Sequence, residues 1–166
     1  MVVGDFPNPP HIRIPLRNQG LFITLLAALR RFPAKNRNDI LFGEWNLKDV
    51  TAHLAGWDRY FTDILECLEA AEEALYWGNI KRFNEASVEK RRRSSWKVVY
   101  EEFTTAGEDF IDRYGQLSAE LLNSRFWSGR PYTPAKILRI NLHHYGQSHL
   151  PEITRKLAAL EARHPA

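Results

Sequence analysis

The feature that most constrains this chain is a long series of apolar residues at helical spacing. Between residues 47 and 75, apolar side chains recur three or four positions apart, which places them on one face of a helix. The members of this stripe are Leu47, Val50, Leu54, Trp57, Phe61, Ile64, Leu68, Ala71 and Leu75. Asn46 can cap the helix, and Asp49 stands three residues on to bond back to the cap. A stripe this long needs other helices to cover it.

Further segments have the same amphipathic pattern. We expect helices at about 16–32, 83–93 and 96–117, and a last helix that starts at Thr133 and Pro134. No segment alternates convincingly as a strand. The sequence therefore predicts an all-α four-helix bundle. We expect residues 16–166 to form it as a single domain, and residues 1–15, with four prolines, to be an extended N-terminal arm.

Composition narrows the class of protein. The chain has 166 residues, 44% of them apolar, which is enough for one core. Its single cysteine, Cys67, excludes an internal disulfide, and the apolar run at 21–29 is too short to span a membrane. The net charge of +3 is only mildly basic, and the cations at 90–93 are typical of a solvated helix face. We expect a cytoplasmic protein with no membrane and no nucleic-acid partner.

The most chemical stretch is HHYGQSHLPEI, at residues 143–153. On a regular α-helix His149 falls within the apolar stripe, with Tyr145 one turn before it, whereas His144 points to the opposite face. His53 lies at the rim of the core on the helix that begins near residue 47. The α-helical projection therefore predicts that His144→Ala leaves any metal or ligand binding intact and that His53→Ala abolishes it.

Two interpretations of the inward histidines stay open. His53 and His149 are either metal ligands or partly buried side chains that form hydrogen bonds within the bundle. Pro151 removes a backbone donor from the same helix, which either kinks the helix and opens a cavity beside His149 or gives plain curvature.

Three stretches together carry a family resemblance. WNLKDVTAHLAGWDRYF (45–61), RFN (82–84) followed by SSWKVVYEEF (94–103), and the histidine stretch at 143–153 resemble the DinB-like four-helix bundles, in particular the ClbS/DfsB branch. The similarity covers roughly residues 19–160. It implies a bundle with one long crossover between the second and third helices. Dimers are frequent in the family, so the resemblance also implies a homodimer. The wider group includes metal-dependent thiol transferases, and the branch includes a protein that hydrolyses a strained cyclopropane ring in a genotoxin.

The resemblance also implies a metal site. Many DinB-like proteins bind a divalent metal through one histidine on the second helix and two on the last, spaced His-x-x-x-His. Here His53 and His149 match, but the remaining histidine falls on Tyr145. We therefore expect a degenerate site at which a divalent metal (Zn, Ni or Fe) is absent rather than bound, although Tyr145, Asp49 or Glu152 could complete it.

Two classes of function follow from these residues. The first is an enzyme acting on a small molecule, a hydrolase or transferase, with a pocket lined by His53, Trp57, Tyr60, Tyr145 and His149. In it a metal-bound water attacks, or His53 or His149 acts as general base with Tyr145 as donor. The alternative is a non-catalytic ligand-sequestering or stress-related binding protein. Asp49, Trp57 and Tyr60 are the candidate ligand-binding residues. Trp57 and Tyr60 could equally serve core packing.

Overall fold

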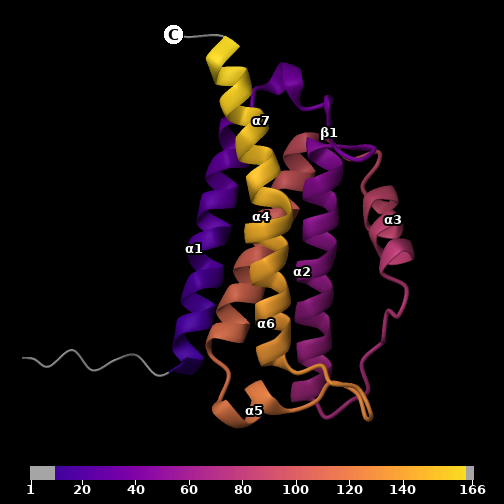
Figure 1. Cartoon of the computed structure of the whole chain (residues 1–166). Helices are drawn as coiled ribbons and strands as arrows, with labels where there is room; N and C mark the ends of the chain where they lie inside the picture. The colour runs from indigo at the N-terminus through magenta and orange to yellow at the C-terminus, as the bar shows by residue number, and fades with distance from the viewer. Residues whose placement is uncertain (1–9, 164–166) are drawn as a thin grey trace, which may run out of the picture.

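Long helical segments run side by side in the computed structural model of the chain, which describes residues 10–163, with side chains from residue 17 on (Figure 1). They are α1 (Pro10–Arg31), α2 (Leu47–Glu69), α4 (Trp96–Gly115) and a last rod made of α6 (Pro134–His143), the π-helical turn η2 (His144–His149) and α7 (Leu150–Arg163). Shorter elements are η1 (Ala34–Asn36), β1 (Ile40–Phe42), β2 (Trp45–Asn46), α3 (Ile80–Lys90) and α5 (Ala119–Asn123). The predicted all-α four-helix bundle is confirmed.

The connection between α2 and α4 is the long crossover that the family resemblance implies. It carries α3 along the outer side of α2, away from α1 (Figure 1). Because of this return, α2 and α4 run in parallel. Arg113, near the end of α4, pairs with Glu66 and Glu69 near the end of α2. The crossover thereby packs α3 against α2, which also contacts α4 and the hairpin strands.

Several predicted helix starts are confirmed. Asn46 caps α2 in a capping box, in which Asp49 accepts a hydrogen bond from the Asn46 backbone N–H. Ser95 caps α4, and Thr133 caps α6 with Pro134 at the first helical position. Each cap satisfies a backbone N–H that the first turn of a helix leaves without a partner.

Two helix boundaries differ from the sequence expectation. The helix α1 begins at Pro10, so residues 10–15 are helical rather than part of an extended arm, and residues 1–9 lie outside the described part of the chain. Pro10 stands at the first helical position, where its missing N–H is not needed. The helix α2 ends at Glu69 rather than near residue 75, because Ala71 adopts a left-handed backbone with φ of 56°.

A short hairpin also forms where we expected no strand. β1 and β2 pair antiparallel, with Ile40 opposite Asn46 and Phe42 opposite Trp45. Gly43, with φ of 59°, makes the turn. Strands of three and two residues are too short to show an alternating pattern in a sequence. The hairpin matters because it places Phe42 and Trp45 next to the last rod and α2.

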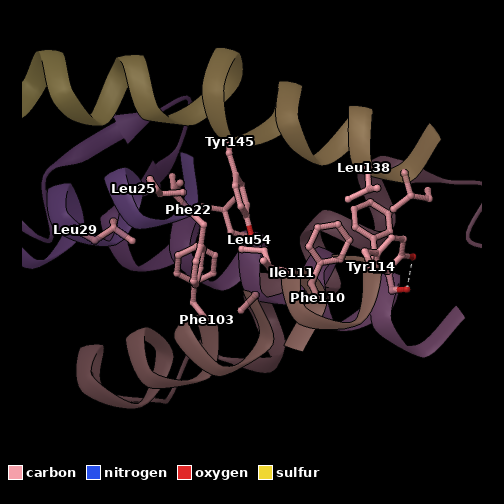
Figure 2. Close-up of a cluster of buried hydrophobic side chains, with 14 of the residues drawn as sticks. Phe22, Leu25, Leu29, Leu54, Phe103, Phe110, Ile111, Tyr114, Leu138 and Tyr145 are labelled. Atoms are coloured by element: carbon pink, nitrogen blue, oxygen red, sulfur yellow. Dashed lines mark hydrogen bonds between the residues drawn. The ribbon is translucent and has the colours of Figure 1, made fainter. Parts of the chain in front are cut away.

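The core lies between the long helices. Phe22 of α1 packs edge-on against Phe103 of α4, with ring centroids 5.5 Å apart, and both lie close to Tyr145 (Figure 2). Further along, Tyr114 donates a hydrogen bond of 2.7 Å to the Phe61 carbonyl, so its one polar atom is satisfied in the core. Between residues 10 and 163, no helix is long and apolar enough to cross a membrane.

Candidate metal centre

Three histidines meet between α2 and the last rod. They are His53 from α2 and His144 and His149, which open and close the π-helical turn. The Nε2 atoms of His53 and His144 lie 2.7 Å apart, and one ring nitrogen from each of the three lies within 4.8 Å of the others. The ring centroids are 4.7 to 5.2 Å apart. We call this group the histidine centre.

The presence of His144 corrects the α-helical projection, which placed it on the opposite face. A π-helix bonds residues five apart, and here the Leu150 N–H donates to the Tyr145 carbonyl. Side chains five positions apart therefore stack on one face, instead of pointing about 140° apart as in an α-helix. His144 and His149 are separated by that spacing, so the wide turn makes them neighbours.

Two residues explain why the wide turn lies here. Pro151 has no N–H for the carbonyl four residues before it, and its ring would clash with that carbonyl inside an α-helix. The turn ends just before it, so Pro151 falls in the first turn of α7, where proline is tolerated. Gly146 faces α1, and a Cβ there would lie 2.9 Å from Leu21 Cδ1, so glycine allows this approach without a shift of the Leu21 side chain. In the sequence, a proline two residues after a His-x₄-His spacing is therefore the signal that indicates a π-helical turn and brings both histidines to one face.

Burial keeps the three imidazoles neutral. It is the main cause that lowers the pKa of His53 from 6.5 to about 3 and that of His149 to about 4, and the neighbouring imidazole of His149 lowers the His53 pKa further. Burial and then His53 also hold the pKa of His144 well below its usual value. Neutral imidazole is the form that binds metals. Within the described residues, Nδ1 of His53 and of His149 is buried with no hydrogen-bond partner.

This donor set fits a divalent metal. Three histidines with a further position left open are typical of catalytic zinc sites. Zn–N bonds of about 2.0–2.1 Å in a tetrahedron separate ligand nitrogens by roughly 3.3 Å. The contact between His53 and His144, at 2.7 Å, is about 0.6 Å shorter than this, so these two rings would part by about that much around an ion. The nitrogen of His149 lies within 4.8 Å of the other two and would move closer where that distance exceeds the ligand spacing. In residues 17–163 no carboxylate joins the three rings in this group.

The histidine centre opens onto a cleft of about 390 Å³. Phe42 and Trp45 of the hairpin lie against it, with ring centroids 5.3 Å from His149 and 4.9 Å from His53, respectively. The other residues lining the cleft are Trp57, Phe61, Ile80, Asn84, Ile140, His143 and Ser148. No Asp, Glu, Lys or Arg is among the described residues that line it. The cleft therefore offers an apolar wall with imidazoles at one end.

The other predicted site residues are spread over different places. Trp57 lines the cleft and donates a hydrogen bond of 2.9 Å to the Asn84 side chain. Tyr60 lies in a neighbouring space, where its hydroxyl donates to the Leu75 carbonyl. Asp49 is engaged in the α2 cap and lines a separate surface cavity. Glu152, a suggested third ligand, pairs with Arg155.

Tyr145 does not face the cleft. Its side chain is 0% exposed, and its hydroxyl donates a hydrogen bond of 2.5 Å to Asp58 Oδ2 in the core. His144, one residue earlier, is the third imidazole of the histidine centre. The premise that only two imidazoles are in register is therefore wrong. Sequence reasoning also missed Phe42, because the hairpin that brings it here was not predicted.

Comparison with known proteins gives a family. The chain matches the model of the mycothiol maleylpyruvate isomerase N-terminal domain over residues 21–145, a span that includes His53 and His144 and ends before His149. This family is part of the DinB-like superfamily. Neither the curated proteins nor the solved structures contain a match to the chain. The match covers most of the chain, and the protein belongs to the mycothiol maleylpyruvate isomerase N-terminal domain family of DinB-like proteins.

Proposed function

We propose that this protein is an enzyme that uses a divalent metal, held by His53, His144 and His149, to act on a small molecule. The observation that carries the proposal is the convergence of three neutral imidazoles on the wall of an apolar cleft. Three imidazoles suit Zn, Ni or Fe and leave further coordination positions for a substrate.

The residues that line the cleft leave a bound metal as its main reactive group. Its described lining holds no carboxylate and no lysine, so the chain offers few groups other than imidazoles for acid–base work. A bound metal lowers the pKa of water or of a thiol that coordinates it, which produces a nucleophile at neutral pH. The description of the family names mycothiol, which supports a thiol as nucleophile and a transferase or isomerase reaction. The ClbS/DfsB resemblance supports water and hydrolysis.

The exposed residue His143 lies at the edge of the same cleft but outside the histidine centre. Its Nδ1 is 3.5 Å from the Ser148 hydroxyl. Free from the metal set and open to solvent, it is placed to carry protons between the cleft and water. It also provides a control, since it is the neighbouring histidine and lies outside the histidine centre.

The test is the metal content of protein purified without an affinity tag, for the wild type, His144→Ala and His143→Ala. We expect about one equivalent of metal in the wild type and in His143→Ala, and its loss in His144→Ala. Equal losses in both variants would contradict the assignment of faces. A wild type that takes up no Zn, Ni or Fe even after incubation would sink the proposal, and the apolar cleft would then favour the ligand-sequestering alternative.

A further inference from the structure

A second space adjoins the cleft and shares walls with it. It measures about 220 Å³, and we call it the aromatic chamber. Trp57, Phe61, Ile80 and Ile140 line both spaces. The walls that belong to the chamber are mainly Tyr60, Tyr76, Trp77, Trp127, Tyr132 and Ile137. The chamber therefore continues the cleft away from the histidine centre.

Two polar side-chain atoms of these walls are engaged with the backbone. The Tyr60 hydroxyl donates to the Leu75 carbonyl and accepts a hydrogen bond from the Trp77 N–H. The Trp127 indole N–H donates to the Ala74 carbonyl at 2.7 Å. These bonds hold the segment between α2 and α3 against the bundle. The chamber is lined by aromatic and aliphatic side chains and one glycine, and two of its donors are already taken, which favours an apolar group.

The charges around the chamber disfavour a cation. Aromatic cages can bind quaternary ammonium groups through their ring faces. Here the Arg130 guanidinium lies 3.7 Å from the centroid of the Tyr76 ring, and the Lys136 ammonium lies 4.5 Å from that of Tyr132. Two of the wall rings thus already carry a cation of the protein itself. No Asp or Glu is among the described lining residues to balance another one.

The volume sets the size of the group. An apolar cavity of about 150 Å³ in a protein core is enough to bind benzene. The aromatic chamber, at about 220 Å³, is larger than that and smaller than the cleft. We propose that the aromatic chamber binds an uncharged aromatic group of one or two fused rings. Binding in the chamber does not depend on the proposed function. The further idea, that the ligand presents its reactive part to a metal on the histidine centre, does rest on it.

The test is a titration with 2-naphthol, followed by quenching of tryptophan fluorescence, with phenyltrimethylammonium as the cationic comparison. The variant is Ile140→Asp, which puts a carboxylate on the wall shared by cleft and chamber. The matched control is Ile23→Asp on α1, away from both spaces; the two side chains are 36% and 59% exposed, respectively. We expect 2-naphthol to bind the wild type and Ile23→Asp equally, and Ile140→Asp at least about tenfold more weakly.

If Ile140→Asp does not fold, the test is repeated with Trp77→Ala and, as its control outside the chamber, Trp96→Ala. The inference would be overturned by no binding of 2-naphthol, by an equal effect of both members of a pair, or by tighter binding of phenyltrimethylammonium than of 2-naphthol.

The variant His53→Ala separates this inference from the proposed function. We expect this variant to lose metal and to keep its affinity for 2-naphthol, whereas loss of both would show that the ring binds at the histidine centre instead. Binding of 2-naphthol by a wild type that takes up no metal would leave the inference standing and remove the proposed function.

Discussion

The interface between α2 and the last rod holds two groups of buried polar side chains that differ in their access to solvent. The histidine centre leaves ring nitrogens without partners and opens onto a cleft. The other group, which we call the Asp58 network, is closed off from solvent, and its side chains bond to one another, with Asn18 Oδ1 the one buried atom of the group that has no partner among the described residues. Buried polar groups are nearly always hydrogen-bonded in native proteins, so the exceptions call for an explanation. The comparison indicates that the network holds the geometry, whereas the histidine centre is the group that a ligand in the cleft can reach.

The Asp58 network connects three helices. Asp58 of α2 accepts hydrogen bonds from Asn141 Nδ2 at 3.0 Å and from the Tyr145 hydroxyl at 2.5 Å. Asn18 of α1 donates to Asn141 Oδ1 at 2.6 Å and to the Leu138 carbonyl at 3.1 Å. Tyr145 directly follows His144 in the π-helical turn. The network therefore fixes that turn against α2, the helix that also carries His53.

The largest expected effect comes from metal itself. A ligand that binds only the folded state stabilises it by about 4 kcal/mol at a free concentration 1,000 times its Kd. We expect Zn at that level to raise the free energy of unfolding of the wild type by this amount, as measured by urea denaturation. His53→Ala should show no such rise, while Asp58→Asn should keep most of it. A loss of the Zn effect in Asp58→Asn as complete as in His53→Ala would erase the distinction between the two groups.

The next effect is a dependence on pH that belongs to the network. Burial raises the pKa of Asp58 from 3.8 to about 7, against the opposing hydrogen bonds from Tyr145 and Asn141. The folded state thus favours the protonated carboxyl, a contribution that is complete below pH 3.8 and is lost as pH rises through 7. Asp58→Asn cannot ionise. We expect its stability relative to the wild type to increase by roughly 2 to 3 kcal/mol between pH 5 and pH 8.

The histidines change stability in the opposite direction over part of this range. Their lowered pKa values favour folding above pH 6.5 and weaken it as pH falls toward 4. Metal-free wild type and Asp58→Asn share these histidines, so the difference between the two proteins isolates Asp58. Asp112→Asn, an exposed change on α4, serves as the control. A flat difference between Asp58→Asn and wild type across pH 5 to 8 would show that Asp58 is ionised throughout.

The smallest effect tests Tyr145 alone. Tyr145→Phe removes the hydroxyl that donates to Asp58 and leaves the ring in the core. We expect a loss of about 1 kcal/mol in the free energy of unfolding, the usual cost of one buried hydrogen bond, with metal content unchanged. If Tyr145→Phe emptied the site of metal as His144→Ala is expected to do, Tyr145 would be a ligand and the separation between network and centre would be wrong.

The sequence by itself determined the helices, their caps and the inward direction of two histidines. Asn46, Ser95 and Thr133 act on backbone groups two or three residues away, and apolar spacing depends only on near neighbours in the chain. Such features are local, so a sequence contains them. His53 and His149 were placed correctly on the buried side because their segments are helical with the expected stripe.

Only the tertiary structure decided which third residue joins them. His144 turns inward because Pro151 ends the α-helical pattern and because the contact of Gly146 with α1 permits a π-helical turn. The hairpin over the cleft and the partners of Asp58 likewise depend on residues far apart in the chain. When the backbone hydrogen bonds of a helix join residues five apart instead of four, every later side chain is rotated about the helix axis. Pro151 is a local signal for a change of step, but the apolar spacing by itself does not show at which residue the step changes.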